Sequence, residues 1–228
     1  MALTKEWTRR IDLWRAELRR QVYRPLEAAV LEGFVTTEQL SAAQASGGKF
    51  APMPAGTRWG AKWEYGWFRT QVTVPKAGAG RRIVLVPDFG GEALVFVNGK
   101  AAAARDQQHR EVTLSRKAKP GERFAVLAEA YAGHGPQVTS GGPVPPGRET
   151  VPEPGPTQAT VGACSFGIWE EDAYQLAIDV ETLYKLRGTL EHDAPEIIDV
   201  VIDVDASVAA GHAPTIRADD HGPATLAA

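Results

Sequence analysis

The central part of the chain alternates apolar and polar residues, a pattern that predicts strands with one buried face. In the stretch WGAKWEYGWFRTQVTVP, residues 59–75, the positions expected on the buried face are Phe68, Thr70, Val72 and Val74. Pro75 lacks a backbone N–H and is expected to end this strand. Phe68 is therefore predicted in a core. Trp67 points to the opposite face and is the better candidate for an exposed or interface ring.

Further short strands are expected along the next hundred residues. The candidate segments are residues 82–86, 93–97, 111–114, 123–131 and 158–168. Asn98-Gly99 separates two extended segments, and both residues tolerate positive φ, so this pair is a strong hairpin signal. Strands joined by tight turns, without helices between them, predict an antiparallel β-sandwich of the jelly-roll type. The fold class is therefore mainly β, flanked by N-terminal and C-terminal helices.

Helical periodicity marks both ends of the chain. Residues 4–32 carry an apolar stripe of Trp7, Ile11, Trp14, Leu18 and Val22. Pro25 is expected to interrupt this helix, with a second helical piece over residues 26–31 and a third over 36–45. A last helix is expected over residues 193–204. The helix expected from Glu170 has as its apolar positions Tyr174, Ile178, Leu183 and Leu186.

These signals divide the chain into four segments. Residues 1–56 are expected to be a helical segment that packs on the sandwich. Residues 57–168 are expected to be the sandwich itself, including a long loop rich in Gly and Pro over 133–157. Residues 169–210 are expected to form a helical connector, and residues 211–228 a frayed tail.

Composition narrows the class of protein. The 228 residues are 43% hydrophobic and 23% charged, and a net charge of −3 gives no electrostatic case for binding nucleic acid. The single cysteine, Cys164, excludes an internal disulfide, and five scattered histidines show no zinc-ligand spacing. No run approaches the roughly 18 apolar residues of a membrane span, and the charged N-terminus lacks the apolar core of a signal peptide. We therefore expect a cytoplasmic protein without membrane or nucleic-acid partners.

Three tryptophans, Trp59, Trp63 and Trp67, recur at four-residue intervals before the central strand. One interpretation is that they fill the core of the sandwich. The other is that one or two lie flat on the surface as a platform for sugar rings. Glu64 and Tyr65 would then be carbohydrate contacts, because acids bind hydroxyl groups and aromatic rings cover the apolar face of a sugar. Both interpretations stay open at this point.

A second group of candidates combines acids with a histidine. Asp106, His109 and Glu111 lie close together in sequence on one leg of a predicted hairpin. They could serve as an acid–base group, as a hydrogen-bonded structural corner, or as contacts with another domain. The corner and the domain contact are the favoured interpretations. We predict no catalytic and no metal-binding residues in this chain.

Specific segments resemble a known family. They are WG at residues 59–60, WFRTQVTVP at 67–75, ALVFVNGKA at 93–101, DQQHREVTL at 106–114 and YQLAIDVETLYKLRGTL at 174–190. In this order they are similar to the N-terminal domain of the α-mannosidases of glycoside hydrolase family 38, of the bacterial and fungal-vacuolar type. The resemblance extends over nearly the whole chain to about residue 205. It implies a galactose-binding-like sandwich that packs beside a catalytic domain.

The resemblance also implies a chemistry located elsewhere. In these enzymes a separate downstream domain binds zinc through histidine and aspartate and cleaves α-mannosides with retention, using an aspartate nucleophile. No motif of the form H-x-H-I-D follows His192 or His212. None of the family's catalytic or zinc residues can therefore be carried over to a position in this chain, and zinc is expected only in the catalytic domain.

Three functions follow. The first is a non-catalytic accessory domain of an α-mannosidase, which contacts the catalytic domain or associates with itself and is able to touch oligosaccharide. The second is a free-standing carbohydrate-binding module that uses the surface tryptophans. The third is an independent glycosidase with an unrecognised site.

Overall fold

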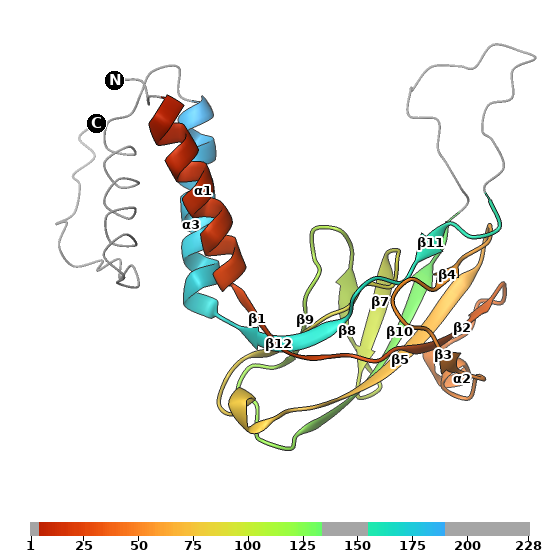
Figure 1. The fold of residues 1–228 in the computed structure, drawn as a ribbon. Coiled ribbons are helices and arrows are strands. Elements are labelled where there is room, and N and C mark those ends of the chain that lie inside the picture. The colour runs from red at the N-terminus through yellow and green to blue at the C-terminus, as the bar shows by residue number, and fades with distance from the viewer. Residues whose placement is uncertain (1–4, 134–154, 190–228) are drawn as a thin grey trace, which may run out of the picture. The chain divides into compact units, whose positions relative to one another are not determined.

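The computed structural model describes residues 5–133 and 155–189 (Figure 1). Its helices are α1 (Lys5–Gln21), α2 (Ala42–Ser46), the short 3-10 helix η1 (Lys76–Gly78) and α3 (Glu171–Thr189). Its strands are β1 (Tyr23–Ala28), β2 (Glu32–Thr36), β3 (Ala51–Pro52), β4 (Arg58–Trp59), β5 (Tyr65–Thr73), β6 (Ile83–Val86), β7 (Ala93–Val97), β8 (Lys100–Arg105), β9 (Val112–Ser115), β10 (Arg123–Tyr131), β11 (Ala159–Thr160) and β12 (Ser165–Trp169). Two compact units result: one contains α1 and α3, and the other is Tyr23–Glu170.

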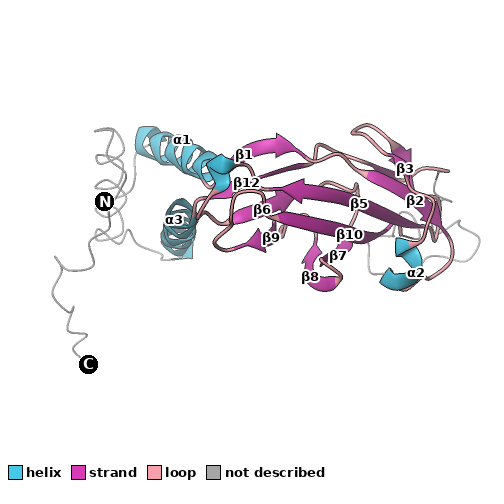
Figure 2. Ribbon diagram, turned by 90° about the horizontal axis from the view of Figure 1, so that it is seen from below, coloured by secondary structure: helices cyan, strands magenta, loops and turns pink. Residues whose placement is uncertain are grey.

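The larger unit is the predicted jelly-roll sandwich, so the fold class is confirmed. One sheet has the strand order β1-β12-β6-β9 and the other the order β3-β2-β5-β10-β7-β8, with β11 and β4 as a separate pair. Every paired strand is antiparallel. The nine-residue strands β5 and β10 form the central pair of the larger sheet (Figure 2).

The core lies between the two sheets and comes from alternate residues of each. Phe68 and Val126 enter it from the larger sheet, and Leu85 and Ile168 enter it from the smaller one. The period of two predicted for the central strand is confirmed, because Phe68, Val72 and Val74 are all buried in this cluster. The Asn98-Gly99 hairpin is confirmed as well: it joins β7 to β8, and both residues have positive φ.

The helical prediction for the N-terminal segment is wrong beyond residue 22. The predicted helical piece at residues 26–31 overlaps β1, and Gly33 lies within β2. Pro25 is accommodated because β1 is an edge strand, where a missing backbone N–H costs no internal ladder bond, and a bulge follows it. The helix predicted over 36–45 shrinks to α2, which begins after a capping box formed by Ser41 and Gln44.

The two long helices form the second unit. The predicted N-terminal helix is confirmed, with Ile11, Trp14 and Leu18 buried. Helix α3 begins after Glu170 as predicted, but its inward residues are Leu176 and Val180, which pack with Trp14 and Leu18.

Two apolar positions predicted for α3, Ile178 and Leu186, are exposed instead. No described helix is both long and apolar enough to cross a membrane. The predicted helix over 193–204, the tail over 211–228 and most of the loop over 133–157 lie outside the described residues.

Candidate functional site

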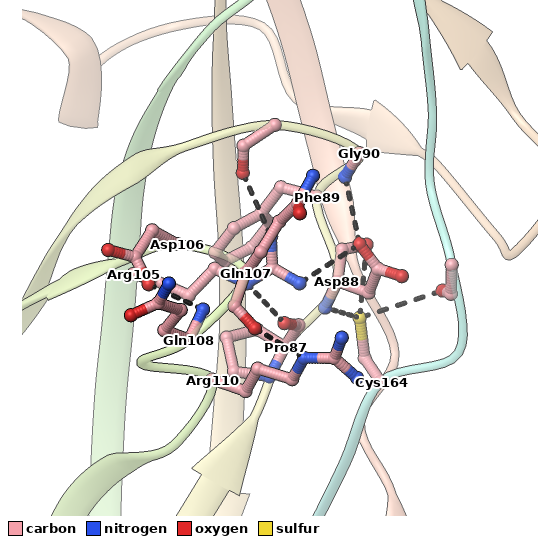
Figure 3. Close-up of polar contacts among 12 residues, drawn as sticks. Pro87, Asp88, Phe89, Gly90, Arg105, Asp106, Gln107, Gln108, Arg110 and Cys164 are labelled. Carbon is pink, nitrogen blue, oxygen red and sulfur yellow. Dashed lines mark hydrogen bonds and ion pairs between the residues drawn. The ribbon is translucent and has the colours of Figure 1, made fainter. Parts of the chain in front are cut away.

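A buried arginine at the end of β8 organises the loop between β6 and β7. The side chain of Arg105 is 10% exposed. Its Nε donates to the Pro87 carbonyl at 3.1 Å, its Nη1 to the Gly91 carbonyl at 3.0 Å, and its Nη2 to Asp88 Oδ1 at 3.2 Å (Figure 3). Hydrogen bonds to a charged donor are stronger than neutral ones, so this guanidinium fixes the loop over residues 87–91.

Two further contacts hold the same loop on the side that faces the core. The Nε1 of Trp59 donates to the Phe89 carbonyl at 2.8 Å, and the Phe89 ring stacks on Phe68 in the core. Gly90 has φ +84°, and a Cβ at this position would lie 2.5 Å from the carbonyl oxygen of Thr160. Only glycine fits there, because the backbone conformation and the close approach both exclude a side chain.

Asp106 and His109 form a hydrogen-bonded corner directly after Arg105. The Asp106 carboxylate accepts the backbone N–H of Gln108 at 2.8 Å and that of His109 at 2.6 Å, and it lies 3.0 Å from His109 Nδ1. These bonds, led by the one from the His109 side chain, lower the pKa of Asp106 to about 2. The same contact raises the pKa of His109, and the half-buried Glu111 adds to that rise.

These loops and the outer face of the larger sheet border two open hollows. We call the first the loop cleft; its volume is about 900 Å³, and it is lined by Asp88, Gly90, Gly91, Glu92, Arg105, Asp106, Gln107, Gln108, Arg110 and Thr160. We call the second the sheet groove; its volume is about 450 Å³, and it is lined by Gln39, Tyr65, Glu92, Ala93, Leu94, Ala104, Arg105, Asp106, Glu129 and Tyr131. Glu92, Arg105 and Asp106 belong to both.

The structure corrects the predicted tryptophan platform. Trp59 is 3% exposed and lies in the core, so it offers no face to a ligand. Trp67 does point away from the core, as predicted, but it is 0% exposed and stacks with Phe96. The prediction of an exposed ring at Trp67 is therefore wrong, and of the three only Trp63, at 54%, is exposed.

The two remaining carbohydrate candidates have different surroundings. The Glu64 carboxylate accepts the backbone N–H of Ala61 at 2.7 Å and so closes a tight turn. Tyr65 is half-buried, and its ring lies beside that of Tyr131 with the centroids 5.1 Å apart. The structure therefore brings Tyr65 and Asp106 together in the sheet groove and leaves Trp59 and Trp67 out of it.

Sequence reasoning missed three groups that shape these hollows: Arg105, Glu129 and Tyr131. A signal existed for Arg105, because it is a charged residue ending the run KAAAAR, and a buried arginine in a strand needs several acceptors. The alternation of β10 predicts that Glu129 and Tyr131 face outward. The contact between Tyr131 and Tyr65 was not predictable, because it depends on the pairing of β10 with β5.

Among the described residues there is no group of three or more His, Cys, Asp or Glu side chains that could hold a metal ion. The chemistry that the two hollows offer is hydrogen bonding and contact with aromatic rings.

The family model described as "Alpha-mannosidase, jelly roll domain" matches residues 24–187. The chain belongs to this family. The match includes the whole sandwich and most of α3, so the jelly-roll architecture seen in the structure is the one that the family describes. The resemblance to an N-terminal domain of α-mannosidases is thereby confirmed.

Two curated relatives carry the same name. The chain is 25% identical over 167 residues to Alpha-mannosidase 2C1 of Homo sapiens and 23% identical over 171 residues to Alpha-mannosidase 2C1 of Mus musculus. Each alignment covers about three quarters of this chain, 72% and 73%, but only 16% of the relative. This jelly-roll domain therefore spans about a sixth of the length of either mannosidase.

Solved structures of β-glucuronidases also align with the chain. A β-glucuronidase from Ruminococcus gnavus in complex with uronic deoxynojirimycin is 13% identical, with a TM-score of 0.45, over 66% of this chain and 29% of the enzyme's chain. The β-glucuronidase of Faecalibacterium prausnitzii is 15% identical, with a TM-score of 0.40, over 66% of this chain and 32% of the enzyme's chain.

Proposed function

We propose that this jelly-roll domain is a non-catalytic accessory domain of an α-mannosidase of glycoside hydrolase family 38, and that it supports the catalytic domain of that enzyme. The observation that carries the proposal is the family match over residues 24–187, a stretch that corresponds to 16% of the human relative. The hydrolysis of α-mannosidic bonds, and the zinc that the family uses for it, then belong to the catalytic domain.

The chemistry of Asp106, the acid of the predicted acid–base group, supports a structural role. Glycoside hydrolysis needs two carboxyl groups on opposite sides of the scissile bond, one of them able to donate a proton. The pKa of Asp106 is about 2, so this carboxyl group is ionised at neutral pH and has no proton to donate. Its carboxylate closes a turn, which is a structural task. We therefore assign Asp106 and His109 to a corner that shapes the domain surface.

The proposed location is the cytoplasm. The one cysteine, Cys164, is free and buried, which suits a reducing compartment.

The proposed partner is the catalytic domain of the mannosidase, and self-association through an exposed face is the alternative. Light scattering on the purified domain distinguishes the two, because a stable dimer in the absence of the catalytic domain would favour self-association.

The non-catalytic assignment is tested with the purified domain alone. We expect no turnover of an aryl α-mannoside, with or without added zinc. Turnover that survives rigorous purification, and that Asp106→Asn abolishes, would support the independent glycosidase and overturn the assignment. A matched control is Asp179→Asn, which changes an acid on α3, outside both hollows.

A further inference from the structure

The outer face of the larger sheet places a pair of tyrosines beside a half-buried acid. Tyr65 and Tyr131 lie opposite each other on β5 and β10, with ring centroids 5.1 Å apart and ring planes inclined by 32°. Glu129 precedes Tyr131 by two residues and faces the same side of the sheet. Within residues 5–133 and 155–189 its carboxylate makes no hydrogen bond or ion pair, and burial raises its pKa.

The surroundings of Glu129 have the dimensions of a ligand site. The sheet groove measures about 450 Å³ and combines apolar lining from Leu94 and the two tyrosines with polar groups at its edges. Small-molecule sites commonly have volumes of about 300–1,000 Å³ and this mixture of apolar walls with a few polar groups. Because the loop cleft shares Glu92, Arg105 and Asp106 with it, a ligand longer than one ring could extend from the groove into the cleft.

The charges in the sheet groove select against anions. The carboxylates of Glu92, Asp106 and Glu129 would repel a phosphate or a carboxylate ligand. The guanidinium of Arg105 donates to the Pro87 and Gly91 carbonyls and to Asp88, so its charge is already paired with an acid outside the groove. Carboxylates only accept hydrogen bonds, so the matching ligand supplies several donors, and the tyrosine rings favour one that also has an apolar face. Hydroxyl groups on a ring with an apolar face meet all of these conditions.

We infer that the sheet groove binds a neutral saccharide, with one sugar ring against the Tyr65–Tyr131 pair and its hydroxyl groups donating to Glu129 and Glu92. The inference names a surface that differs from the predicted tryptophan platform and retains only Tyr65 from it. The conclusion that the ligand is a saccharide rests on the residues that line the groove. The choice of an α-mannoside as that saccharide rests on the proposed function.

The test is a titration of the complete chain with α-1,2-mannobiose, followed by calorimetry and by NMR of the ligand. Tyr131→Ala should weaken binding roughly two- to tenfold, because it removes the ring contact. Tyr131→Phe keeps the ring and should bind as the original chain does. Glu129→Gln, which removes the charge and keeps the shape, should weaken binding about tenfold. Glu27→Gln removes an exposed acid from β1 in the other sheet and should change nothing.

Three results would overturn the inference: no saturable binding at millimolar mannobiose, equal binding by the Tyr131→Ala and Glu129→Gln variants, or tighter binding of the cation spermidine than of the sugar. If Tyr131→Ala does not fold, Glu129→Gln and Tyr131→Phe still decide the matter. Absence of sugar binding by a domain that still accompanies mannosidase activity would overturn this inference and leave the proposed accessory role standing.

Discussion

At the scale of single residues, Trp59 and Trp67 differ in what their indole N–H groups contact. Trp59 Nε1 donates to the Phe89 carbonyl, whereas Trp67 Nε1 is buried and has no hydrogen-bond partner within the described residues. A buried polar group without a partner costs free energy, and so does a carbonyl that loses its donor. Two residues of the same type, both nearly inaccessible, therefore contribute differently to stability.

The matched substitutions are Trp59→Phe and Trp67→Phe. Both remove similar volume from a packed site, but only Trp59→Phe leaves the buried Phe89 carbonyl without its donor. We expect Trp59→Phe to lower the free energy of unfolding by about 1–3 kcal/mol more than Trp67→Phe does. Urea denaturation followed by circular dichroism measures the difference. Equal losses would show that the bond to Phe89 contributes nothing net.

The Asp106–His109 contact gives a prediction in pH. Because the contact raises the pKa of His109 in the folded chain, its stabilising contribution is fully present below the unfolded pKa of about 6.5 and is lost as the pH rises through the folded value. For Asp106, whose pKa is lowered, the contribution is present above its ordinary pKa and is lost as the pH falls toward about 2.

An NMR titration of the His109 ring measures this directly. We expect a pKa above that of the urea-unfolded chain, and Asp106→Asn should bring it down toward the unfolded value. Glu111→Gln is the comparison, since Glu111 contributes the smaller part of the rise. A His109 pKa that is the same in the Asp106→Asn variant as in the original chain would contradict the geometry of the corner.

At the scale of elements, the loop between β6 and β7 depends on the absence of a side chain at Gly90. Gly90 and Gly99 both have positive φ, but a Cβ at Gly90 would strike the backbone of Thr160, whereas at Gly99 it meets nothing within 4 Å. Gly99→Ala should cost about 1–2 kcal/mol for the left-handed conformation alone. Gly90→Ala should cost clearly more and should also raise hydrogen exchange in β11. Equal costs, measured by urea denaturation, would contradict the close approach.

The pairing of α1 with α3 depends on two residues of α3, Leu176 and Glu181, that the sequence pattern did not single out. Leu176 is buried with Trp14 and Leu18, and Glu181 forms ion pairs with Arg15 and Arg19. We expect Leu176→Ala to cost about 2–3 kcal/mol and to increase hydrogen exchange in both helices, whereas Ile178→Ala, at an exposed position, should change little. If the two variants exchange alike, the assigned inward face of α3 is wrong.

The sequence predicts the elements that depend on interactions between residues close together in the chain, and it misses those that depend on distant strands. The alternation around Phe68 and the Asn98-Gly99 turn depend on near neighbours, so the central strand and the hairpin were predicted correctly. The strand at Pro25 depends on its place at a sheet edge, and the burial of Trp67 depends on Phe34 and Phe96, which distant strands bring to it. The tyrosine pair in the sheet groove likewise exists only because β5 pairs with β10.

At the scale of the whole molecule, the described residues form two units, a β-sandwich and a pair of helices. In the sandwich, hydrogen bonds from Arg105 hold the loop between β6 and β7. The role that we propose, beside a catalytic domain, rests on the family match and on the small share of the relatives that it spans. Arg105 and Asp106, which line both hollows, are anchored by contacts with the backbone, so these two side chains present a fixed arrangement. A partner domain or a sugar chain would meet this arrangement without ordering it first.

The most direct test of the accessory role is to tag this chain at its own gene and to purify it from its native cells under mild conditions. The purified material is then assayed for hydrolysis of an aryl α-mannoside. The account predicts zinc-dependent α-mannosidase activity that accompanies the tagged chain and is absent from the same chain produced alone. Purified material from native cells with no α-mannosidase activity above that of an untagged control would contradict it.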